Sequence, residues 1–545
     1  MTRDHEQKQG FLVARRALLK SAGAIIGAAG LPSLSALAKQ AGVMRVGLGS
    51  RDMGSLHPHV ATGSNDTPII DSVFSGLLRY ASPRVAIDGI EPDLAERWEA
   101  SSDHKTYTFH LRKGAKWHKG YGEVTSEDVK YSLAWVRENP QSTFKPLYGN
   151  IERVETPDPY TVVISLKNVD PVFPIAVANW QGGYMICKKA SEELGDKYKN
   201  QPIGSGPFQF ESYRPKDNVT LSANPDYYFG KPKLDRVIFS YIPDETSRRF
   251  AFVQQEVDVI QGQASEEWLA EIQKSTPGGA IVDLLGPSRV TAIHMKKSVK
   301  PLDNLDVRKA IAHAINRDDY VQFFGRVFQP SFTAIPADYF GTMPQDRIPK
   351  ELIYEFDPDK SKALLKSAGF AGGFKLETVV SERSDYLNLA QIAREQLAAV
   401  GIDLKLNVMD HGSWIAAIIK EKKGSLVWST ASRFPSAELI LREFWLCSAD
   451  VTKPSGVQGF AEYCNPTFDS TYQAGIESFD PAIRAKNFQE AQLIELKDVP
   501  SVPLGGLTTP TLRQGYVDLG YKVEKDKPFL SLPYMYHLNH LTSVG

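Results

Sequence analysis

Small hydroxyls and one arginine follow directly on a short apolar run near the carboxyl third of the chain. The sequence LVWSTASRFPSAE covers residues 426 to 438, with Trp428 closing the apolar run and Ser429, Thr430 and Arg433 following it. An arginine guanidinium can donate two hydrogen bonds to a carboxylate or phosphate, hydroxyls orient a ligand, and an indole provides a flat apolar surface. These residue types therefore indicate a binding site for a small polar or anionic molecule.

Two more polar segments follow predicted strands. Arg383 comes shortly after the segment Lys375–Val380, and His411 comes shortly after Ile402–Val408. Because ligands of open parallel sheets bind outside the carboxyl ends of the strands, we expect these ends to meet at one edge. Each residue also has a structural interpretation, since a strand tryptophan often belongs to the core and an exposed arginine is often solvated or ion-paired. The expected ligand-binding set is Arg383, His411, Trp428, Ser429, Thr430 and Arg433, with no catalytic residue and no metal ligand.

The segments that carry these residues alternate between helix and strand. Asp357-Pro358 is typical of a helix start, and Gly369 is typical of its end. Helices are further predicted over Leu387–Ala399 and Trp414–Lys422, and a third strand over Ser425–Trp428. A strand, a helix and a second strand form a right-handed crossover unit, so the fold class is α/β with an open sheet in this half.

The amino-terminal half has a different pattern. Tyr107–Leu111 alternates apolar and polar residues, and Thr125-Ser126-Glu127-Asp128 predicts a capping box that opens a helix. Further strands are predicted over Tyr160–Leu166, Pro207–Ser212 and Asn218–Ser222, the last two as an antiparallel pair. This half is therefore expected to be a separate, mixed α+β lobe.

Length and charge narrow the function classes. A chain of 545 residues exceeds what one hydrophobic core usually supports, so two or more lobes are expected. Lys and Arg number 63 against 64 Asp and Glu, with no run of like charges, so a nucleic-acid partner is disfavoured.

The amino terminus has the order of an export signal. A paired Arg15-Arg16 precedes an Ala/Gly-rich apolar stretch, and Ala36-Leu37-Ala38 is a small-residue cleavage pattern. We expect a twin-arginine type signal peptide over residues 1–38 and a free periplasmic protein, not lipid-anchored, because no cysteine lies near the cleavage point. The alternative is an amphipathic first helix or a short anchor.

Two of the three cysteines flank a polar loop. Cys447 and Cys464 lie on either side of Lys453-Pro454-Ser455-Gly456, whose flexibility would let the two sulfurs meet in an oxidising compartment. The alternative is a pair of free thiols. Cys187 has no evident partner and is expected to be a small buried residue.

The order of several motifs resembles the peptide and nickel class of extracytoplasmic solute-binding proteins that serve ABC importers. The resemblance runs from about Met44 to about Val523. It rests on segments in matching order, among them Glu91-Pro92-Asp93-Leu94-Ala95-Glu96-Arg97-Trp98, Ser126-Glu127-Asp128-Val129, Pro202-Ile203-Gly204-Ser205-Gly206-Pro207-Phe208, Asn224-Pro225-Asp226-Tyr227-Tyr228 and Tyr463-Cys464-Asn465-Pro466.

This resemblance implies a two-lobed periplasmic binding fold that closes on a solute. It implies a first lobe of residues 39–291 completed by 506–545, a second lobe of residues 292–505, and a disulfide between Cys447 and Cys464. It also implies a monomer without a cofactor that works with ABC permease and ATPase subunits in the inner membrane.

This chain departs from the family pattern at positions that similar proteins use to bind their ligand. Similar peptide binders carry an aspartate where this chain has Ala431, and a dipeptide binder would place a tryptophan at His411. Arg383 matches the arginine that such binders use for the ligand carboxylate, although the loop length differs. The solutes expected from this pattern are a modified peptide, an opine, a sugar conjugate or another small anion.

Two other function classes compete with solute binding. A nickel-type metal or metal-chelate carrier is suggested by His57-Pro58-His59 and by His537-Leu538-Asn539-His540, but neither pair has the carboxylate or thiolate neighbours that complete a site. A secreted hydrolase is disfavoured because Gly204-Ser205-Gly206-Pro207 lacks the nucleophile-elbow pattern.

Overall fold

The computed structural model describes most of the chain after its amino-terminal segment. It covers residues 42–518 with gaps at 62–65, 81–89, 171–172, 179, 285–288, 338, 433–435, 454–455 and 457, and it also covers 543–544. The signal peptide expected over residues 1–38 and the pair His537 and His540 lie outside the described residues.

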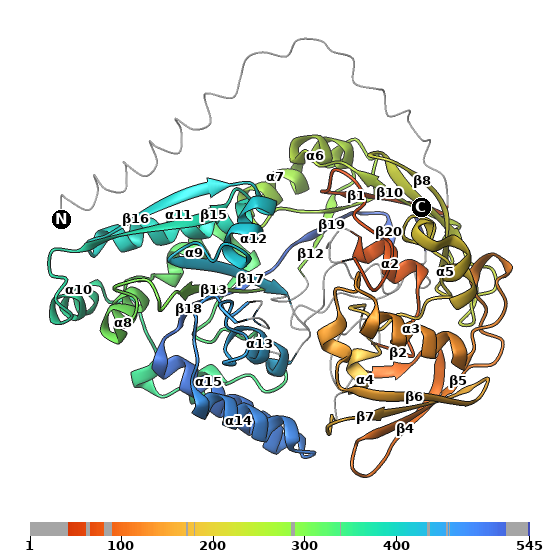
Figure 1. Ribbon diagram of the computed structural model, residues 1–545. Helices are drawn as coiled ribbons and strands as arrows, with labels where there is room; N and C mark the ends of the chain where they lie inside the picture. Colours follow the sequence, from red (N-terminus) through yellow and green to blue (C-terminus); the bar gives the residue numbers. More distant parts are fainter. Residues whose placement is uncertain are drawn as a thin grey trace. The chain divides into compact units, whose positions relative to one another are not determined.

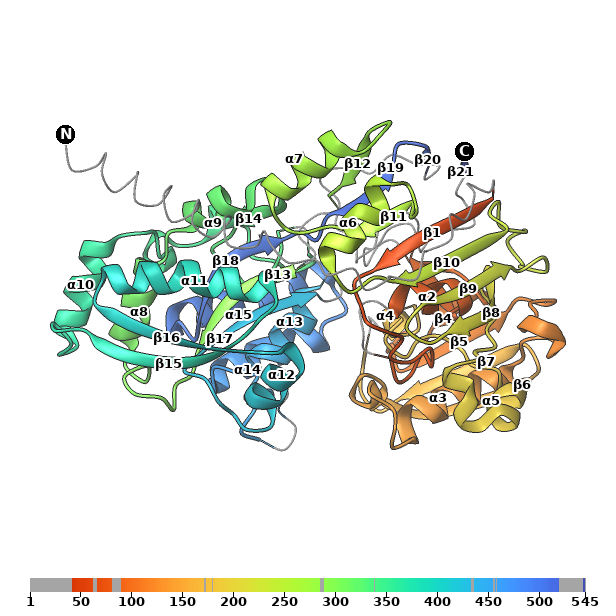
Figure 2. The same cartoon turned by 90° about the horizontal axis from the view of Figure 1, so that it is seen from above.

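A seven-stranded mixed sheet contains both early and late parts of the chain (Figures 1 and 2). Its strand order is β12 (Ala280–Asp283), β19 (Thr511–Gln514), β11 (Val259–Gln261), β1 (Val43–Leu48), β10 (Arg236–Tyr241), β9 (Asn218–Ala223) and β8 (Phe208–Arg214). Strands β8 and β9 pair antiparallel, which confirms the predicted pair. Because β19 lies between β11 and β12, the carboxyl-terminal chain completes a sheet that begins with β1.

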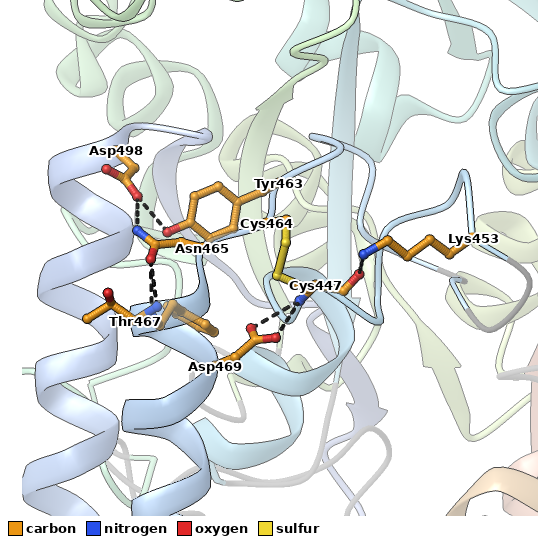
Figure 3. Close-up of a disulfide and its surroundings, with 9 residues drawn as sticks. Cys447, Lys453, Tyr463, Cys464, Asn465, Thr467, Asp469 and Asp498 are labelled. Atoms are coloured by element: carbon orange, nitrogen blue, oxygen red, sulfur yellow. Dashed lines mark hydrogen bonds between the residues drawn. A yellow bond between two sulfur atoms is a disulfide. The ribbon is translucent and has the colours of Figure 1, made fainter.

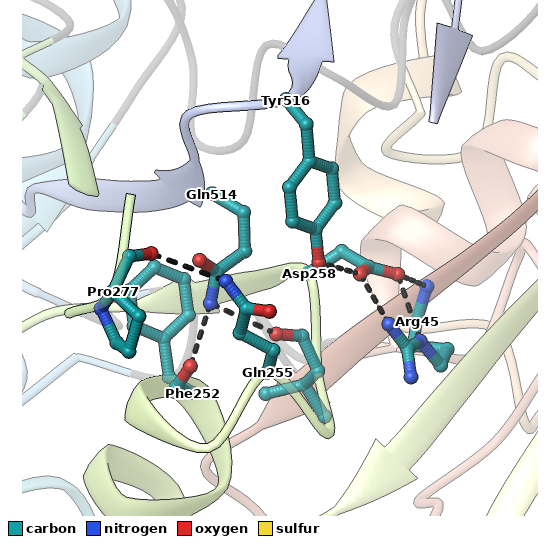
Figure 4. Close-up of polar contacts among 8 residues, drawn as sticks. Arg45, Phe252, Gln255, Asp258, Pro277, Gln514 and Tyr516 are labelled. Atoms are coloured by element: carbon teal, nitrogen blue, oxygen red, sulfur yellow. Dashed lines mark hydrogen bonds and ion pairs between the residues drawn. The ribbon is translucent and has the colours of Figure 1, made fainter. Parts of the chain in front are cut away.

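A buried ion pair joins these distant segments (Figure 4). Arg45 Nη2 on β1 lies 2.6 Å from Asp258 Oδ1, and Arg45 Nε donates to Asp258 Oδ2 at 3.0 Å. Tyr516, beyond β19, donates its hydroxyl hydrogen bond to Asp258 Oδ1 at 2.7 Å. Breaking such a pair leaves an uncompensated buried charge, so all three segments depend on each other for stability.

A four-stranded antiparallel sheet follows in the first half. Its order is β4 (Ala95–Ala100), β5 (Thr106–Leu111), β7 (Thr161–Leu166) and β6 (Ile151–Asp158). Helix α3 (Ser126–Glu138) begins at Thr125, and the predicted capping box with Asp128 is confirmed. The short strands β2 (Leu78–Tyr80) and β3 (Ile90–Pro92) form a separate pair.

The predicted crossover unit is present in the second half. Strands β15 (Phe374–Ser381) and β16 (Ile402–Met409) pair in parallel, and α11 (Ser384–Ala399) connects them (Figure 1). Helix α10 (Pro358–Ser367) begins where expected, since the Asp357 carboxylate accepts from the backbone N–H of Lys360. The third predicted strand is β17 (Leu426–Ser432), and α12 (His411–Ile419) precedes it.

The hydrogen-bonded partner of β17 is a strand that comes much earlier in the chain. β17 pairs antiparallel with β13 (Arg289–Met295), in a sheet of order β14 (Phe328–Pro330), β18 (Ser501–Leu507), β13 and β17. Side-chain hydrogen bonds also hold β17 beside β15. Ser425, the residue before β17, donates from Oγ to Glu377 O at 3.0 Å, and Thr378 Oγ1 donates to Leu426 O at 2.5 Å. Both contacts hold the start of β17 beside the middle of β15.

The remaining elements cover these sheets. They are α2 (Thr67–Val73), α4 (Phe173–Ala176), α5 (Lys188–Leu194), α6 (Glu245–Val253), α7 (Glu266–Ser275), α8 (Leu305–Ala314), α9 (Arg317–Phe324), α13 (Ala437–Phe444), α14 (Pro466–Glu477), α15 (Pro481–Asp498), β20 (Val517–Asp518) and β21 (Ser543–Val544). Two large buried apolar clusters form the cores, one mainly before residue 242 and one mainly after residue 250. No helix in the described part of the chain is long and apolar enough to span a membrane.

Cys447 and Cys464 form a disulfide at the start of α14 (Figure 3). The backbone N–H of Cys447 donates to both oxygens of Asp469, at 3.1 and 3.3 Å. Tyr463 and Asn465 each donate to Asp498 Oδ2 at 2.7 Å. The disulfide is thus part of a polar network that connects the segment after α13 with α14 and the end of α15.

Candidate functional site

Ser381 connects the ends of β15 and β16. Its side-chain oxygen accepts from the backbone N–H of Arg383 at 3.3 Å and lies 3.0 Å from His411 Nδ1. His411 is the first residue of α12, where the Asp410 carboxylate accepts from the N–H of Ser413 at 3.0 Å. Strand ends and helix starts thus bring Arg383 and His411 together, as the sequence predicts for parallel strands.

Two arginines share one carboxylate beside these residues. Arg383 donates to both oxygens of Asp385, at 3.0 Å from Nε and 2.7 Å from Nη2. Arg289, the first residue of β13, donates from Nη1 to Asp385 Oδ2 at 2.8 Å. Two guanidinium charges therefore meet a single carboxylate charge, which leaves one net positive charge in this group. We call the two arginines, Arg289 and Arg383, together with their shared partner Asp385, the arginine pair.

The arginine pair lies at the amino terminus of a long helix. Arg383 is the N-cap residue of α11, and its own side chain makes no capping hydrogen bond. The first backbone N–H groups of a helix lack intrahelical partners, and the helix dipole adds partial positive charge there. Together with two arginines, such an end favours a bound carboxylate.

Other carboxylates at this edge are solvated. Glu382 and Asp410 are both exposed, and Asp410 is occupied in capping α12. Solvent and salt screen exposed charges more than the half-buried Arg289 and Asp385, whose side chains are 15% and 16% exposed. Arg289 and Asp385 are thus less screened than the exposed charges of this edge, whereas the side chain of Arg383 is 42% exposed.

The neighbouring rings are neutral at physiological pH. Burial, and then the charge of Arg383, lower the pKa of His411. Burial raises the pKa of Tyr386, and a side-chain hydrogen bond with Thr430 opposes that change. The Tyr386 ring lies 5.5 Å from both the His411 ring and the Arg383 guanidinium carbon. Thr430 therefore belongs to the same cluster as Arg383 and His411, with Tyr386 between them.

Trp428 and Ser429 face inward. Trp428 is 1% exposed within the second-half core, and Ser429 is 8% exposed with its Oγ at 2.8 Å from His294 Nε2. His294 in turn stacks on Phe444 with ring centroids 5.1 Å apart. Arg433 lies outside the described residues. The structure thus groups Arg383, His411 and Thr430, while Trp428 and Ser429 are both buried and, as neighbours in β17, point to opposite faces of its sheet.

Sequence reasoning missed three residues of this cluster. Asp385 and Tyr386 were assigned to a connecting segment, because the helix was expected to begin at Leu387 and begins instead at Ser384. Arg289 carried no local signal, since only the pairing of β13 with β17 brings it to Asp385.

The early histidine pair belongs to a buried aromatic cluster. His59 Nε2 lies 2.8 Å from Tyr184 O, and the backbone N–H of His59 donates to His57 Nδ1 at 3.2 Å. The His57 ring stacks on Trp135 at 4.1 Å. Within the described residues no group of three or more His, Cys, Asp or Glu could hold a metal ion.

Comparison with known proteins identifies the family. Residues 89–451 match the family of bacterial extracellular solute-binding proteins, family 5. The di/tripeptide-binding protein 2 of Pseudomonas aeruginosa is 27% identical over 76% of this chain and 80% of its own length. The glutathione-binding protein GsiB of Salmonella choleraesuis is 28% identical over 88% and 91%, respectively.

Solved structures of solute-binding proteins also resemble this chain. MoaA from Agrobacterium tumefaciens R10, solved with mannopinic acid, is 33% identical with a TM-score of 0.80, covering 90% of this chain and 97% of MoaA. AgaA from the same strain, solved with agropinic acid, is 25% identical with a TM-score of 0.75, covering 92% and 98%. The chain therefore belongs to the bacterial extracellular solute-binding proteins of family 5, two-lobed α/β proteins that bind solutes for ABC importers and are not enzymes.

Proposed function

We propose that this protein captures a small anionic solute of the opine or sugar-conjugate type in the periplasm and delivers it to an ABC permease. The arginine pair carries this assignment, because its surplus positive charge lies at the start of α11. The solute carboxylate would share the donors of Arg383 and Arg289 with Asp385, and Thr430 and His411 would orient the adjoining polar atoms.

A peptide is the second candidate. Two relatives are named as di/tripeptide-binding and glutathione-binding proteins. A peptide with a free amino terminus needs an acceptor for its ammonium group, and Ala431 stands where similar peptide binders carry an aspartate. The identity of 33% to a protein solved with mannopinic acid exceeds the identity to either named peptide or glutathione binder. We therefore favour an anionic solute without a free ammonium group at this position.

The cellular setting follows the same proposal. Residues 1–38 would be a twin-arginine type signal, leaving a free periplasmic monomer. Residues 39–291 with 506–545 would form one lobe and residues 292–505 the other. Permease and ATPase subunits in the inner membrane would be the protein partners, and Trp428, Ser429 and Arg433 would support or extend the ligand site.

Ligand identification tests the proposal directly. The mature protein would be purified and its bound small molecules released and identified by mass spectrometry. Thermal-shift measurements would follow with mannopinic acid, agropinic acid, glutamate and the dipeptide Met-Leu. We expect an opine or another carboxylated sugar conjugate to give the largest increase in Tm. Stabilisation by the dipeptide alone would contradict the assignment.

A further inference from the structure

The two ring nitrogens of His411 have different surroundings. Its Nδ1 lies 3.0 Å from Ser381 Oγ, and the parallel register that pairs Ser381 with Met409 brings the two residues together. Its Nε2 has no hydrogen-bond partner among the described residues and is not a buried atom, since the ring is partly exposed. Nε2 is therefore the nitrogen of His411 that a bound solute can reach.

Two aromatic rings fix the orientation of His411. Trp414, buried on the same helix, stacks on it with ring centroids 5.4 Å apart, and the Tyr386 ring lies 5.5 Å from it. The Tyr386 ring is also 5.5 Å from the guanidinium carbon of Arg383. Because both rings and Ser381 hold the imidazole, its Nε2 is kept in one orientation beside the arginine pair.

The hydroxyl of Ser381 determines which nitrogen of His411 carries the proton. Ser381 is fully buried, and its Oγ accepts from the backbone N–H of Arg383 at 3.3 Å. Its own hydrogen has one acceptor among the described residues, which is His411 Nδ1. A buried hydroxyl without an acceptor costs free energy, so Ser381 donates to Nδ1. A neutral imidazole whose Nδ1 accepts carries its proton on Nε2.

The surroundings of this ring favour its neutral form. Burial, and then the charge of Arg383, lower the pKa of His411. Arg289 acts in the same direction, whereas Asp385 and the exposed Asp410 oppose it. At neutral pH the ring is therefore uncharged, and its Nε2–H is a hydrogen-bond donor that cannot accept.

We propose that Ser381 fixes the proton of His411 on Nε2, and that this N–H selects the solute by donating to an oxygen near the carboxylate held by the arginine pair. The proposal rests on the proposed function and adds to it a specificity-determining residue, His411, and a positioning residue, Ser381. The matching solute atom is a hydroxyl, carbonyl or second carboxylate oxygen. A solute that places a hydrogen-bond donor there finds no acceptor on the ring and binds more weakly.

Nitrogen NMR tests the proton position without any solute. Protein labelled with ¹⁵N-histidine would be studied at neutral pH through correlations between the ring nitrogens and the protons on the ring carbons. The His411 signals are those missing from His411→Gln. We expect a protonated Nε2 and an unprotonated Nδ1 in the unmodified protein. A proton on Nδ1 would overturn the proposal.

The variant Ser381→Ala tests the positioning role. Without the hydroxyl, both proton positions of His411 should become populated, which shifts its nitrogen signals. The matched control is Ser361→Ala, because Ser361 is equally buried in the same half of the chain and donates from Oγ to Ala310 O at 2.7 Å. This control should leave the His411 signals unchanged. Signals that are also unchanged in Ser381→Ala would overturn the role of Ser381.

Calorimetry with mannopinic acid tests the contribution of the N–H to binding. His411→Leu has no donor and should bind this acid about tenfold more weakly, as expected for the loss of a hydrogen bond to a charged group. His411→Gln places an amide N–H near the position of Nε2 and should recover most of the affinity. Both variants lose the Nδ1 acceptor of Ser381, so the difference between them reports the donor alone.

The outcomes separate this proposal from the proposed function. If mannopinic acid binds and Arg383→Ala weakens it, but His411→Leu binds normally, selection by His411 is overturned while the proposed function stands. If the unmodified protein binds only the dipeptide Met-Leu, the proposed function is overturned, and selection by His411 falls with it even where the proton lies on Nε2. Weak binding by His411→Leu that His411→Gln restores, together with a protonated Nε2, supports the proposal.

Discussion

Arg289 Nη1 lies 2.8 Å from Asp385 Oδ2, although the two residues are separated by 96 positions in the chain. Arg289 begins β13, and Asp385 lies in the first turn of α11. The contact requires β17 to pair with β13 and to run beside β15 at the same time. One short antiparallel strand thus brings the second arginine to an edge otherwise built by parallel strands.

Replacing Arg383 by alanine should weaken solute binding at least tenfold, or about 1.4 kcal/mol. The reason is loss of the guanidinium that borders the amino-terminal end of α11. Isothermal titration with the solute identified from the purified protein is the measurement. Arg394→Ala, an exposed arginine on the same helix, is the control and should bind normally. Unchanged affinity in Arg383→Ala would remove Arg383 from the site.

Replacing Asp385 by asparagine should move affinity and stability in opposite directions. The amide removes the carboxylate charge that Arg289 and Arg383 share, so the affinity for an anionic solute should rise severalfold at low salt. The free energy of unfolding should fall by about 1 kcal/mol, because the half-buried Arg289 and the more exposed Arg383 lose their shared counter-charge.

Urea unfolding and calorimetry at low and high salt measure these two effects. Asp359→Asn, in the exposed first turn of α10, is the control and should change neither quantity appreciably. Weaker binding of the anion to Asp385→Asn at every salt concentration would show instead that Asp385 serves chiefly to position the arginines.

The parts of the fold that depend on local signals could be predicted from the sequence. Helix α10 starts at its predicted cap, and β15 and β16 form the predicted parallel pair, because capping residues and apolar alternation act over a few residues. The pairing of β17 with β13 was not predictable, since antiparallel partners can lie anywhere in the chain. Arg289 was missed for the same reason.

Trp428 shows why the site was predicted only in part. The sequence predicts a strand that ends at Trp428, whereas β17 continues to Ser432. A tryptophan that closes an apolar run has the same sequence pattern whether it borders a ligand or fills a core, and here its ring is buried. His411 and Arg383 were placed correctly at one edge because the carboxyl ends of parallel strands must meet. Helices α11 and α12 begin earlier than the sequence predicts. The apolar periodicity that predicts these helices begins only after the cap Asp410 of α12 and after the first turn of α11.

Removing the disulfide should lower the free energy of unfolding by about 3 kcal/mol, the amount expected for a loop of this size. Cys447 and Cys464 are 17 positions apart, and the bridge restricts the unfolded chain between them. Urea unfolding of Cys447→Ser/Cys464→Ser measures the loss. The double variant should no longer respond to dithiothreitol, whereas the unmodified protein should be destabilised by it. Burial raises the pKa of Cys187 to about 12, so this thiol should not contribute to the response.

Asp71 should make the protein less stable as the pH rises toward neutrality. Its carboxyl is buried on α2 and accepts from the Tyr184 hydroxyl at 2.8 Å, and burial raises its pKa from 3.8 to about 7. A raised pKa means that the folded state binds the proton more tightly than the unfolded state. This contribution is therefore complete below pH 3.8 and is lost as the pH rises through about 7.

The variant Asp71→Asn isolates this effect, because the amide oxygen still accepts from Tyr184 and never ionises. Above pH 7 it should raise the free energy of unfolding, by at most about 4 kcal/mol given about 1.36 kcal/mol per pKa unit. Near pH 4 the variant and the unmodified protein should be equally stable. Asp196→Asn, an exposed control, should show no pH-dependent difference, and a gain for Asp71→Asn that is equal at both pH values would show that ionisation of Asp71 is not the cause.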